Sequence, residues 1–251
     1  MLTGQGGNIG FSVGDDGVFM IDDQFARLTP KILEAIKKIS DRPIQFLVNT
    51  HWHGDHTGGN ENMAKQGVKI IAQDNVYKRL SESTPETPKE ALPIITFNDK
   101  LHIHVNSEDV LVFHVDNAHT DGDALLYFPE SNVLHTGDTF FNGLYPFIDL
   151  DSGGSVDGYI AAVKKALIMV DDETKIIPGH GKLGNKEQYK FFLSMLEDLK
   201  SKVLAEIAKG KTEDEVTANT SLTKTYDDLG YSWDFINSEK IRRTFYKSLK
   251  K

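Results

Sequence analysis

Four side chains that commonly bind metals are gathered in one short segment, HWHGDH, at residues 51 to 56. Imidazole and carboxylate together suit zinc, and they also suit iron or manganese. Side chains two residues apart on an extended chain point the same way, so His51 and His53 can share one ion. Gly54 permits a sharp turn, after which Asp55 and His56 face elsewhere and can serve a second ion. The spacing therefore predicts a site for two cations.

Three further metal-binding side chains occur later, each in a short turn-like segment beside a small residue. His119 lies in NAHTDGD between two strand-like stretches, Asp138 lies in HTGDT after an apolar stretch, and His180 lies in PGHG after another. Taken alone, His119 reads as a structural histidine and Asp138 as a turn residue. Because all three stand at or near the C-terminal end of an expected strand, where α/β sheets place their sites, we expect their loops to converge on one edge of the fold.

The elements that must position these side chains fall into two series. In the first half, apolar runs at 8–12 and 18–21 predict a hairpin, Thr29-Pro30 predicts a helix start, and residues 43–48 and 68–72 read as buried strands. Asp74 is expected to cap a short helix. Residues 81–93 are polar and contain prolines, which predicts a loop.

The second half changes period. Short apolar stretches at 101–105, 110–115, 124–128 and 133–135 predict an antiparallel meander, followed by a helix at 155–170 and a strand at 175–177. A long helix is expected at 186–208, and Thr212 with Glu215 predicts a capping box that opens two further helical pieces. These elements can form two α/β halves whose sheets pack together with helices outside.

Composition excludes several classes of site and partner. The chain has 251 residues and no cysteine, so disulfides, cysteine-ligated zinc and thiol nucleophiles are excluded. The net charge of −9 opposes binding to nucleic acid or to anionic membranes. The start lacks the basic and apolar regions of a signal peptide, but it enters strand-like sequence directly, as a truncated N-terminus would. Both a periplasmic and a cytoplasmic location therefore stay open, as does the oligomeric state.

The motifs resemble those of the metallo-β-lactamase superfamily of hydrolases. HWHGDH matches that family's HxHxDH motif, and the His119 turn, the Gly137-Asp138 pair and the Gly179-His180 pair follow in the family's order. The resemblance covers residues 1–185 and implies an α/β fold, the four-layer αββα sandwich, with residues 186–251 as extra C-terminal helices packed on the same domain. It also implies a division of the ligands. His51, His53 and His119 would hold the first zinc ion, Asp55, His56 and His180 the second, and Asp138 would bridge them.

Two departures separate the chain from the best-known β-lactamase subclass. That subclass has a cysteine where this chain has Asp138, and it has a long flap in the first hairpin where this chain has only the turn from Gly14 to Gly17. An aspartate bridge is more similar to the glyoxalase II, lactonase and related esterase branches. His53 also differs from the glutamate of the flavodiiron oxidoreductases.

Such a site would hydrolyse a small carbonyl compound: a β-lactam, a lactone, an ester or a thioester. Two divalent ions can share one hydroxide and lower the pKa of bound water to roughly 7, and that hydroxide would attack the carbonyl carbon. Asp55 would orient the hydroxide as well as bind metal, which makes it the expected catalytic residue. Two alternatives stay open: a mononuclear iron oxygenase of the persulfide dioxygenase type, and a binding protein that keeps the fold without catalysis.

The substrate-binding residues are expected in the aromatic loop after Asp138. Phe140, Phe141, Asn142 and Tyr145 are the candidates, because a loop that follows a metal ligand is well placed to line a cleft. Packing beneath the loop is the competing interpretation of its aromatic residues. Residues 22–25 are expected on the opposite wall. The helices after residue 186 can either cover the mouth of the cleft, as a helical extension does in glyoxalase II, or act as a stabilising appendage.

Overall fold

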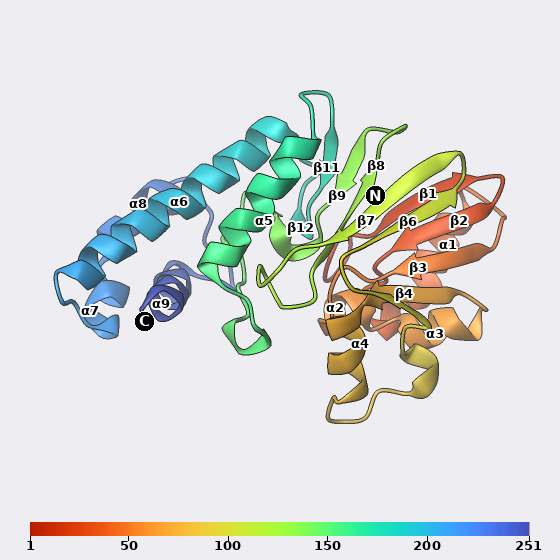
Figure 1. Ribbon diagram of the computed structural model, residues 1–251, viewed down its shortest axis with the longest axis horizontal. Helices are drawn as coiled ribbons and strands as arrows, with labels where there is room; N and C mark the ends of the chain where they lie inside the picture. Colours follow the sequence, from red (N-terminus) through yellow and green to blue (C-terminus); the bar gives the residue numbers. More distant parts are fainter. Residues whose placement is uncertain (251) are drawn as a thin grey trace.

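The computed structural model describes residues 1–250 (Figure 1). The strands are β1 (Gly10–Gly14), β2 (Gly17–Ile21), β3 (Ile44–Val48), β4 (Lys69–Gln73), β5 (Ile95–Phe97), β6 (Lys100–Val105), β7 (Glu108–His114), β8 (Ala124–Phe128), β9 (Val133–His135), β10 (Phe141–Asn142), β11 (Lys175–Ile177) and β12 (His180–Gly181). The α-helices are α1 (Thr29–Lys37), α2 (Gly54–Thr57), α3 (Asn60–Lys65), α4 (Asp74–Ser81), α5 (Val156–Met169), α6 (Lys186–Ala208), α7 (Glu213–Ala218), α8 (Lys224–Asp227) and α9 (Ser238–Leu249).

Two five-stranded sheets form the centre of the molecule. The first has the order β1-β2-β3-β4-β5, with β1 antiparallel to β2 and the others parallel, and the second has the order β11-β9-β8-β7-β6. Strands β6 to β9 are antiparallel neighbours in sequence order, which confirms the expected meander. A small parallel pair, β10 and β12, lies outside both sheets.

Alternating side chains divide the core into layers. On β2, Val18 and Met20 pack in one apolar cluster with Ile32 of α1 and Met63 of α3. The intervening Phe19 belongs to a second cluster, with side chains of the other sheet. Because successive strand residues point to opposite faces, one strand supplies both the helix-facing and the sheet-facing layer.

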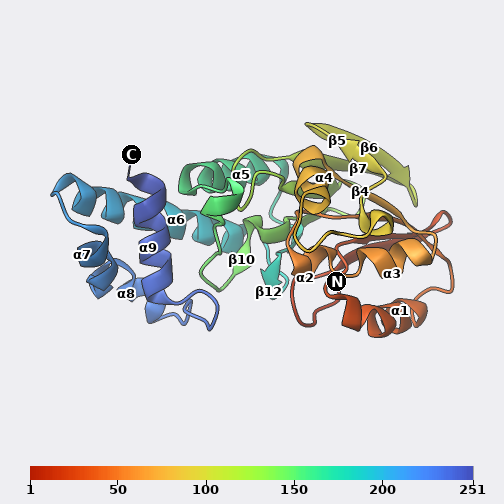
Figure 2. The same cartoon turned by 90° about the horizontal axis from the view of Figure 1, so that it is seen from below.

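The second sheet is covered on its far side by α5 and α6. Leu125 and Ile176 from the sheet pack in one cluster with Tyr159 of α5 and Phe192 of α6. Figure 2 shows α1 and α3 beneath one sheet and α5 on the side of the other. The order helix, sheet, sheet, helix confirms the expected four-layer αββα sandwich, and the extra C-terminal helices are present.

The C-terminal segment folds into α6 and three shorter helices rather than the two expected pieces after it. Capping boxes open α6 at Asn185 and α7 at Thr212, the second as expected. Asn219 leaves the helical conformation after α7, and its side chain accepts from Ser221 N–H, so the chain restarts as α8 and then α9. Helix α9 packs against α6 and α7 at the end of the molecule away from α1 (Figure 1). No helix within residues 1–250 has the length and apolar character of a membrane span.

One local expectation in the first half is wrong, and one strand was missed. Gln73, rather than Asp74, caps α4, because its side chain accepts a hydrogen bond from Asn75 N–H while Asp74 is already the first helical residue. The edge strand β5 was not expected. Ile95, its first residue, and Ile94, the residue before it, are both exposed. The apolar residues here therefore do not alternate between core and solvent.

Candidate metal centre

The structure brings all seven predicted ligand side chains together. They form two groups, in each of which one ligand atom per residue lies within 4.8 Å of the others: His51, His53, His119 and Asp138 in the first, and Asp55, His56 and His180 in the second. Strands β7, β9 and β11 run in the same direction, so the segments that follow them, with His119, Asp138 and His180, meet at one edge. The HWHGDH segment follows β3 of the facing sheet.

A short helix begins between the two pairs of ligands inside HWHGDH and contains the second pair. His53 is extended and stands as the residue before α2, which begins at Gly54. Asp55 and His56 therefore lie on the first helical turn and contribute to a different group from His51 and His53, although the His56 ring lies 4.2 Å from the His51 ring. The sharp turn predicted at Gly54 is the start of this helix.

In the first group, the hydrogen-bond partners define which nitrogen of His51 is free. The Thr50 hydroxyl donates to Asp22 Oδ2 over 2.7 Å, so its oxygen accepts from His51 Nδ1–H at 3.1 Å. His51 is fully buried. The Nε2 of His51 is therefore unprotonated and offers a lone pair toward the centre of the group.

The other two histidines of this group are fixed in the same manner. His53 Nε2–H donates to Asp149 Oδ2 at 2.9 Å, and His119 Nδ1–H donates to the Phe147 carbonyl oxygen at 2.8 Å. Each ring keeps its other nitrogen bare. Such a bond on the outer nitrogen is the usual arrangement of a metal-binding histidine.

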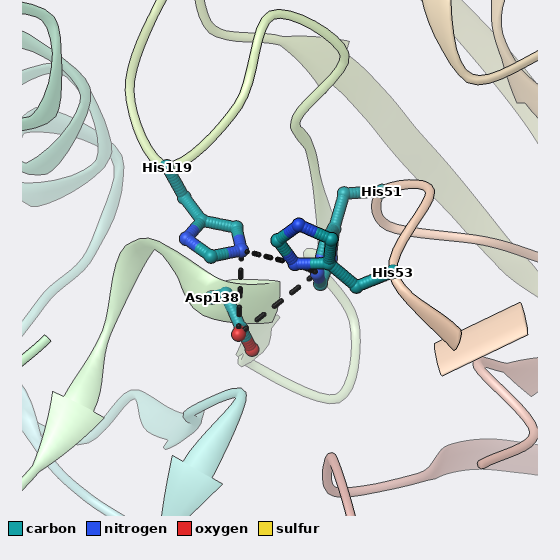
Figure 3. Close-up of side chains that lie close together, drawn as sticks. All are labelled: His51, His53, His119 and Asp138. Carbon is teal, nitrogen blue, oxygen red and sulfur yellow. Dashed lines mark hydrogen bonds and ion pairs between the residues drawn. The ribbon is translucent and has the colours of Figure 1, made fainter. Parts of the chain in front are cut away.

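The three bare nitrogens face one another at close range. His53 Nδ1 lies 3.2 Å from His51 Nε2 and 2.9 Å from His119 Nε2. Figure 3 shows the three rings turned toward the carboxylate of Asp138. Three lone pairs at these distances repel unless a cation lies among them, so the donor chemistry of this group fits a bound cation.

The second group contains polar atoms without partners. His56 Nδ1–H donates to Asp22 Oδ2 at 2.7 Å, which leaves His56 Nε2 bare. Within residues 1–250, the buried His56 Nε2 and Asp138 Oδ1 have no hydrogen-bond partner, although they lie 3.1 Å apart. His180 Nε2 lies 3.3 Å from Asp55 Oδ2. Because unpaired buried polar atoms are costly, these two atoms also fit a cation that binds both.

Asp138 lies between the two groups. Its Oδ2 is 3.5 Å from His119 Nε2 and 3.4 Å from His180 Nε2, while its Oδ1 points to His56. The side chain is almost completely buried. One carboxylate therefore has an oxygen within reach of a cation in either group.

The electrostatics favour positive charge at the second group. Burial lowers the pKa of His119 to about 4, so that ring is neutral and can bind metal. Burial alone would also lower the pKa of His180, but the Asp138 carboxylate raises it to about 9. A raised histidine pKa means that positive charge is stabilised there, and a divalent cation would supply that charge in place of the proton.

Two glycines make room for the ligands. A Cβ atom on Gly7 would overlap the ring of His56, and one on Gly179 would overlap Asp138 Oδ1. Gly7 comes from the segment before β1 and Gly179 from the turn after β11. The ligand cage is thus closed by backbone that carries no side chain at these points.

No sequence pattern pointed to the two carboxylates that hold the ligand rings. Asp22 accepts from both Thr50 and His56, has a positive φ of 59° and is fully buried. Asp149 lies 96 positions from its partner His53. Asp22 directly follows the buried strand β2, and this position was a usable signal. The loop around Asp149 contains a second acidic residue, Asp151, and nothing in the sequence distinguishes the two.

A cavity of about 420 Å³ opens at the metal groups. Its lining combines ligand side chains with aromatic rings from four parts of the chain: Phe25, His53, Gly54, Asp55, Asp138, Phe141, Phe147, His180, Trp233 and Phe235. Of residues 22–25, which were expected on the wall, only Phe25 lines the cavity, and the other three are buried. The size is typical of small-molecule sites.

The expected substrate-binding residues divide. Phe141 lines the cavity and stacks on His180 with a ring separation of 4.9 Å. Phe140 instead packs in the core against Tyr189 and Phe192, and Tyr145 is fully buried with its hydroxyl donating to Asp227.

The structure therefore corrects the expectation for Phe140 and Tyr145, which face the interior because the loop after Asp138 sits on α6 and the C-terminal segment. Asn142 is also turned away from the cavity. Its side-chain amide donates to the Lys182 carbonyl oxygen at 2.9 Å, beside the β10–β12 pair. For Phe140 and Tyr145, packing beneath the loop is the interpretation that fits.

Residues from the C-terminal segment were not expected individually. Trp233 and Phe235, in the connection between α8 and α9, both line the cavity. Three aromatic residues close together in YSWDFIN, two of which line the cavity, were the available signal. The sequence left two roles open for this segment, a cover of the cavity mouth and a stabilising appendage. The position of Trp233 and Phe235 on the cavity lining supports the cover.

Comparison with known proteins identifies the family of this chain. The sequence profile of the Metallo-beta-lactamase superfamily matches residues 2–180. A metallo-beta-lactamase type 2 from Bacillus sp. (strain 170) is 20% identical over 182 residues, which are 72% of this chain and 69% of the relative. A hydroxyacylglutathione hydrolase from Pelagibacter ubique (strain HTCC1062) is 28% identical over 170 residues, which are 65% of this chain and 63% of the relative.

Solved structures show the same fold. A metallo-beta-lactamase from Pontibacter korlensis superposes with a TM-score of 0.66 at 21% identity, over 75% of this chain and 86% of that chain. A sec-alkylsulfatase, Pisa1 from Pseudomonas sp., superposes with a TM-score of 0.73 at 20% identity, over 96% of this chain and 47% of that chain. The second likeness extends over the C-terminal helices as well as the sandwich.

Proposed function

The chain belongs to the metallo-beta-lactamase superfamily, and we propose that it is a metal-dependent hydrolase of carbonyl compounds that holds two cations. His51, His53 and His119 would bind one cation, Asp55, His56 and His180 the other, and Asp138 both. Zinc is the proposed metal, with iron or manganese as the other metals that this donor set accepts. Relatives named metallo-beta-lactamase and hydroxyacylglutathione hydrolase support a hydrolase.

The observation that carries this proposal is the position of Asp138. Its Oδ2 lies near His119 of the first group and His180 of the second, and its Oδ1 and His56 Nε2 have no hydrogen-bond partner within residues 1–250. A mononuclear site would need only one of the groups. The second group, with its own carboxylate Asp55 and two histidines, favours two cations over the single iron of the oxygenase alternative.

When bound, divalent cations supply a Lewis acid and a water of lowered pKa. The chain supplies the acceptor for a proton. Burial alone would raise the pKa of Asp55, but His56 and His180 lower it, so the carboxylate is ionised. Asp55 lines the cavity with Oδ2 close to His180. It is therefore placed to orient an attacking water and to accept its proton while the substrate carbonyl lies in the cavity.

The proposed substrates are esters, lactones, thioesters and β-lactams. A β-lactam antibiotic carries a carboxylate that needs a partner, and the residues described as lining the cavity include neither lysine nor arginine. We therefore expect slow β-lactam hydrolysis compared with that of neutral esters or lactones.

The test combines metal analysis with a substrate panel. Protein purified without chelator and supplied with zinc is assayed on chromogenic β-lactam, lactone, ester and thioester substrates, next to Asp55→Asn. We expect two cations per chain, turnover of at least one carbonyl substrate, and a loss of turnover in the variant. Two bound cations with no turnover of any substrate would contradict the proposal. A single iron with oxygen consumption on a persulfide would favour the oxygenase.

A further inference from the structure

We propose that residues 231–237, between α8 and α9, form the specificity wall of the cavity and select an uncharged apolar group on the substrate. This inference rests on the proposed function, because it assigns the substrate class of the same site. The wall is defined by Trp233 and Phe235, which line the cavity, and the Trp233 ring lies 6.1 Å from the ring of His180. It gives the C-terminal segment a role in recognition.

The wall completes a continuous series of rings around the cavity. From His53 the series passes to Phe147 at 5.6 Å between ring centroids, to Phe235 at 5.2 Å and to Trp233 at 5.6 Å. From Trp233 it continues to Phe141 at 6.1 Å and ends on His180 at 4.9 Å. The two ends of the series, His53 and His180, are candidate ligands of the two metal groups. A substrate group that lies against these rings would therefore be close to the proposed cations.

Both N–H groups of Trp233 already have hydrogen-bond partners within the protein. Trp233 Nε1–H donates to the Tyr145 carbonyl oxygen at 3.0 Å, and Tyr145 N–H donates to the Tyr231 carbonyl oxygen at 2.9 Å. Trp233 N–H donates to the Ile236 carbonyl oxygen. These bonds hold the loop in place and turn the indole nitrogen to the backbone. The substrate therefore meets ring carbon on this side.

Charge supports the same conclusion. The charged side chains on the cavity lining, as far as residues 1–250 define it, are the carboxylates and histidines of the metal groups. Lys240 lies near the wall, but its ammonium is 4.2 Å from the Phe235 ring centroid, donates to the Phe235 carbonyl oxygen and is not on the lining. A remote anionic group on a substrate would be desolvated there without a partner, which is unfavourable.

An aromatic ring suits this wall best. Aromatic pairs prefer offset or edge-to-face contacts with centroids about 4.5–7 Å apart, and such contacts add to the burial of apolar area. Phe235 is half exposed, so its ring has a free face. We therefore use a phenyl group as the probe of the uncharged apolar class.

The test compares two esters that differ in one distal charge. The metal-loaded full-length protein is assayed with ethyl phenylacetate and with ethyl 4-carboxyphenylacetate. Binding of the matching ketones, 1-phenylpentan-2-one and 1-(4-carboxyphenyl)pentan-2-one, is measured by calorimetry, because a ketone cannot be hydrolysed. Phe235→Ala is compared with Leu229→Ala, an exposed apolar residue in the same connection that does not line the cavity.

We expect the neutral ester and ketone to be preferred by about tenfold or more. Phe235→Ala should remove most of that preference, and Leu229→Ala should keep it, with both variants folded in thermal melts. Equal turnover of the neutral and charged esters with equal binding of the two ketones, or a preference that survives Phe235→Ala, would overturn the specificity wall. If the neutral ketone binds selectively while neither these esters nor any substrate of the carbonyl panel is hydrolysed, the proposed function fails and the wall stands.

Discussion

Asp149 holds His53 by a single hydrogen bond, with 2.9 Å between Asp149 Oδ2 and His53 Nε2. The same carboxylate accepts from Ser152 N–H through Oδ1, so its position is set by the short turn that follows. The bond leaves His53 Nδ1 free and directs it toward His51 and His119. Asp149 therefore positions a candidate ligand without contacting the cations itself.

Replacement of Asp149 by asparagine should weaken cation binding at the first group. The amide keeps the acceptor for Ser152 N–H but can no longer stabilise His53 with a charged partner, so we expect about a 10- to 100-fold loss of affinity. The measurement is competition with a chelator of known affinity. Asp151→Asn, an exposed neighbour, is the matched control. Equal affinity in both variants would show that Asp149 has no part in metal binding.

Asp138→Ala should reduce the number of bound cations. Its oxygens face both groups, but the first group keeps three histidines, whereas the second keeps His56, His180 and the more exposed Asp55. We therefore expect the second cation to be lost first and turnover to fall by orders of magnitude. Elemental analysis after dialysis gives the stoichiometry. Retention of both cations at full rate would mean that Asp138 is only a turn residue.

Removal of metal should destabilise the fold, because it leaves bare nitrogens and carboxylates buried together. A cation present at 100 times its dissociation constant adds about 2.7 kcal/mol to the free energy of unfolding. For a chain of this size, that corresponds to a drop in melting temperature of about 5–10 °C on addition of chelator. Scanning calorimetry measures the shift. Asp138→Ala should respond less than the native chain, and an equal shift in both would argue against cations at this site.

The neighbours Phe140 and Phe141 should behave differently. Phe140 packs against Tyr189 and Phe192 in the core, so Phe140→Ala should lower the free energy of unfolding by about 3–5 kcal/mol and leave relative substrate preference unchanged. Phe141 lines the cavity, so Phe141→Ala should change that preference. Urea unfolding and a comparison of kcat/KM values for two esters test the pair. A preference altered by Phe140→Ala alone would reverse the assignment.

The sandwich and the meeting of the ligand loops were predictable because they depend on local signals. The apolar runs before HWHGDH and before Asp138 mark strand ends, and parallel strands bring such ends to one edge. The same reasoning could not separate Phe140 from Phe141. Phe140, directly before β10, contacts Tyr189 and Phe192 of α6, whereas Phe141 contacts His180, and only the packing of α6 decides which of the two rings reaches the cavity.

Contacts between distant segments were also beyond sequence patterns. Trp233 reaches the cavity because Tyr145, 88 positions earlier, anchors it through a backbone carbonyl. Backbone acceptors carry no side-chain signature, so no motif marks such a bond. Asp149 was hidden for the same reason, since the residue that it holds lies in another part of the fold.

The placement of the ring series has a consequence for how this scaffold can be altered. The candidate ligands come from loops at strand ends, while Trp233 and Phe235 come from a connection that follows both sheets in the chain. Exchange of that connection would leave every candidate ligand and its supporting carboxylate in place. Selection for a new substrate could therefore act on a segment of a few residues, and chemistry and recognition could diversify independently in one domain.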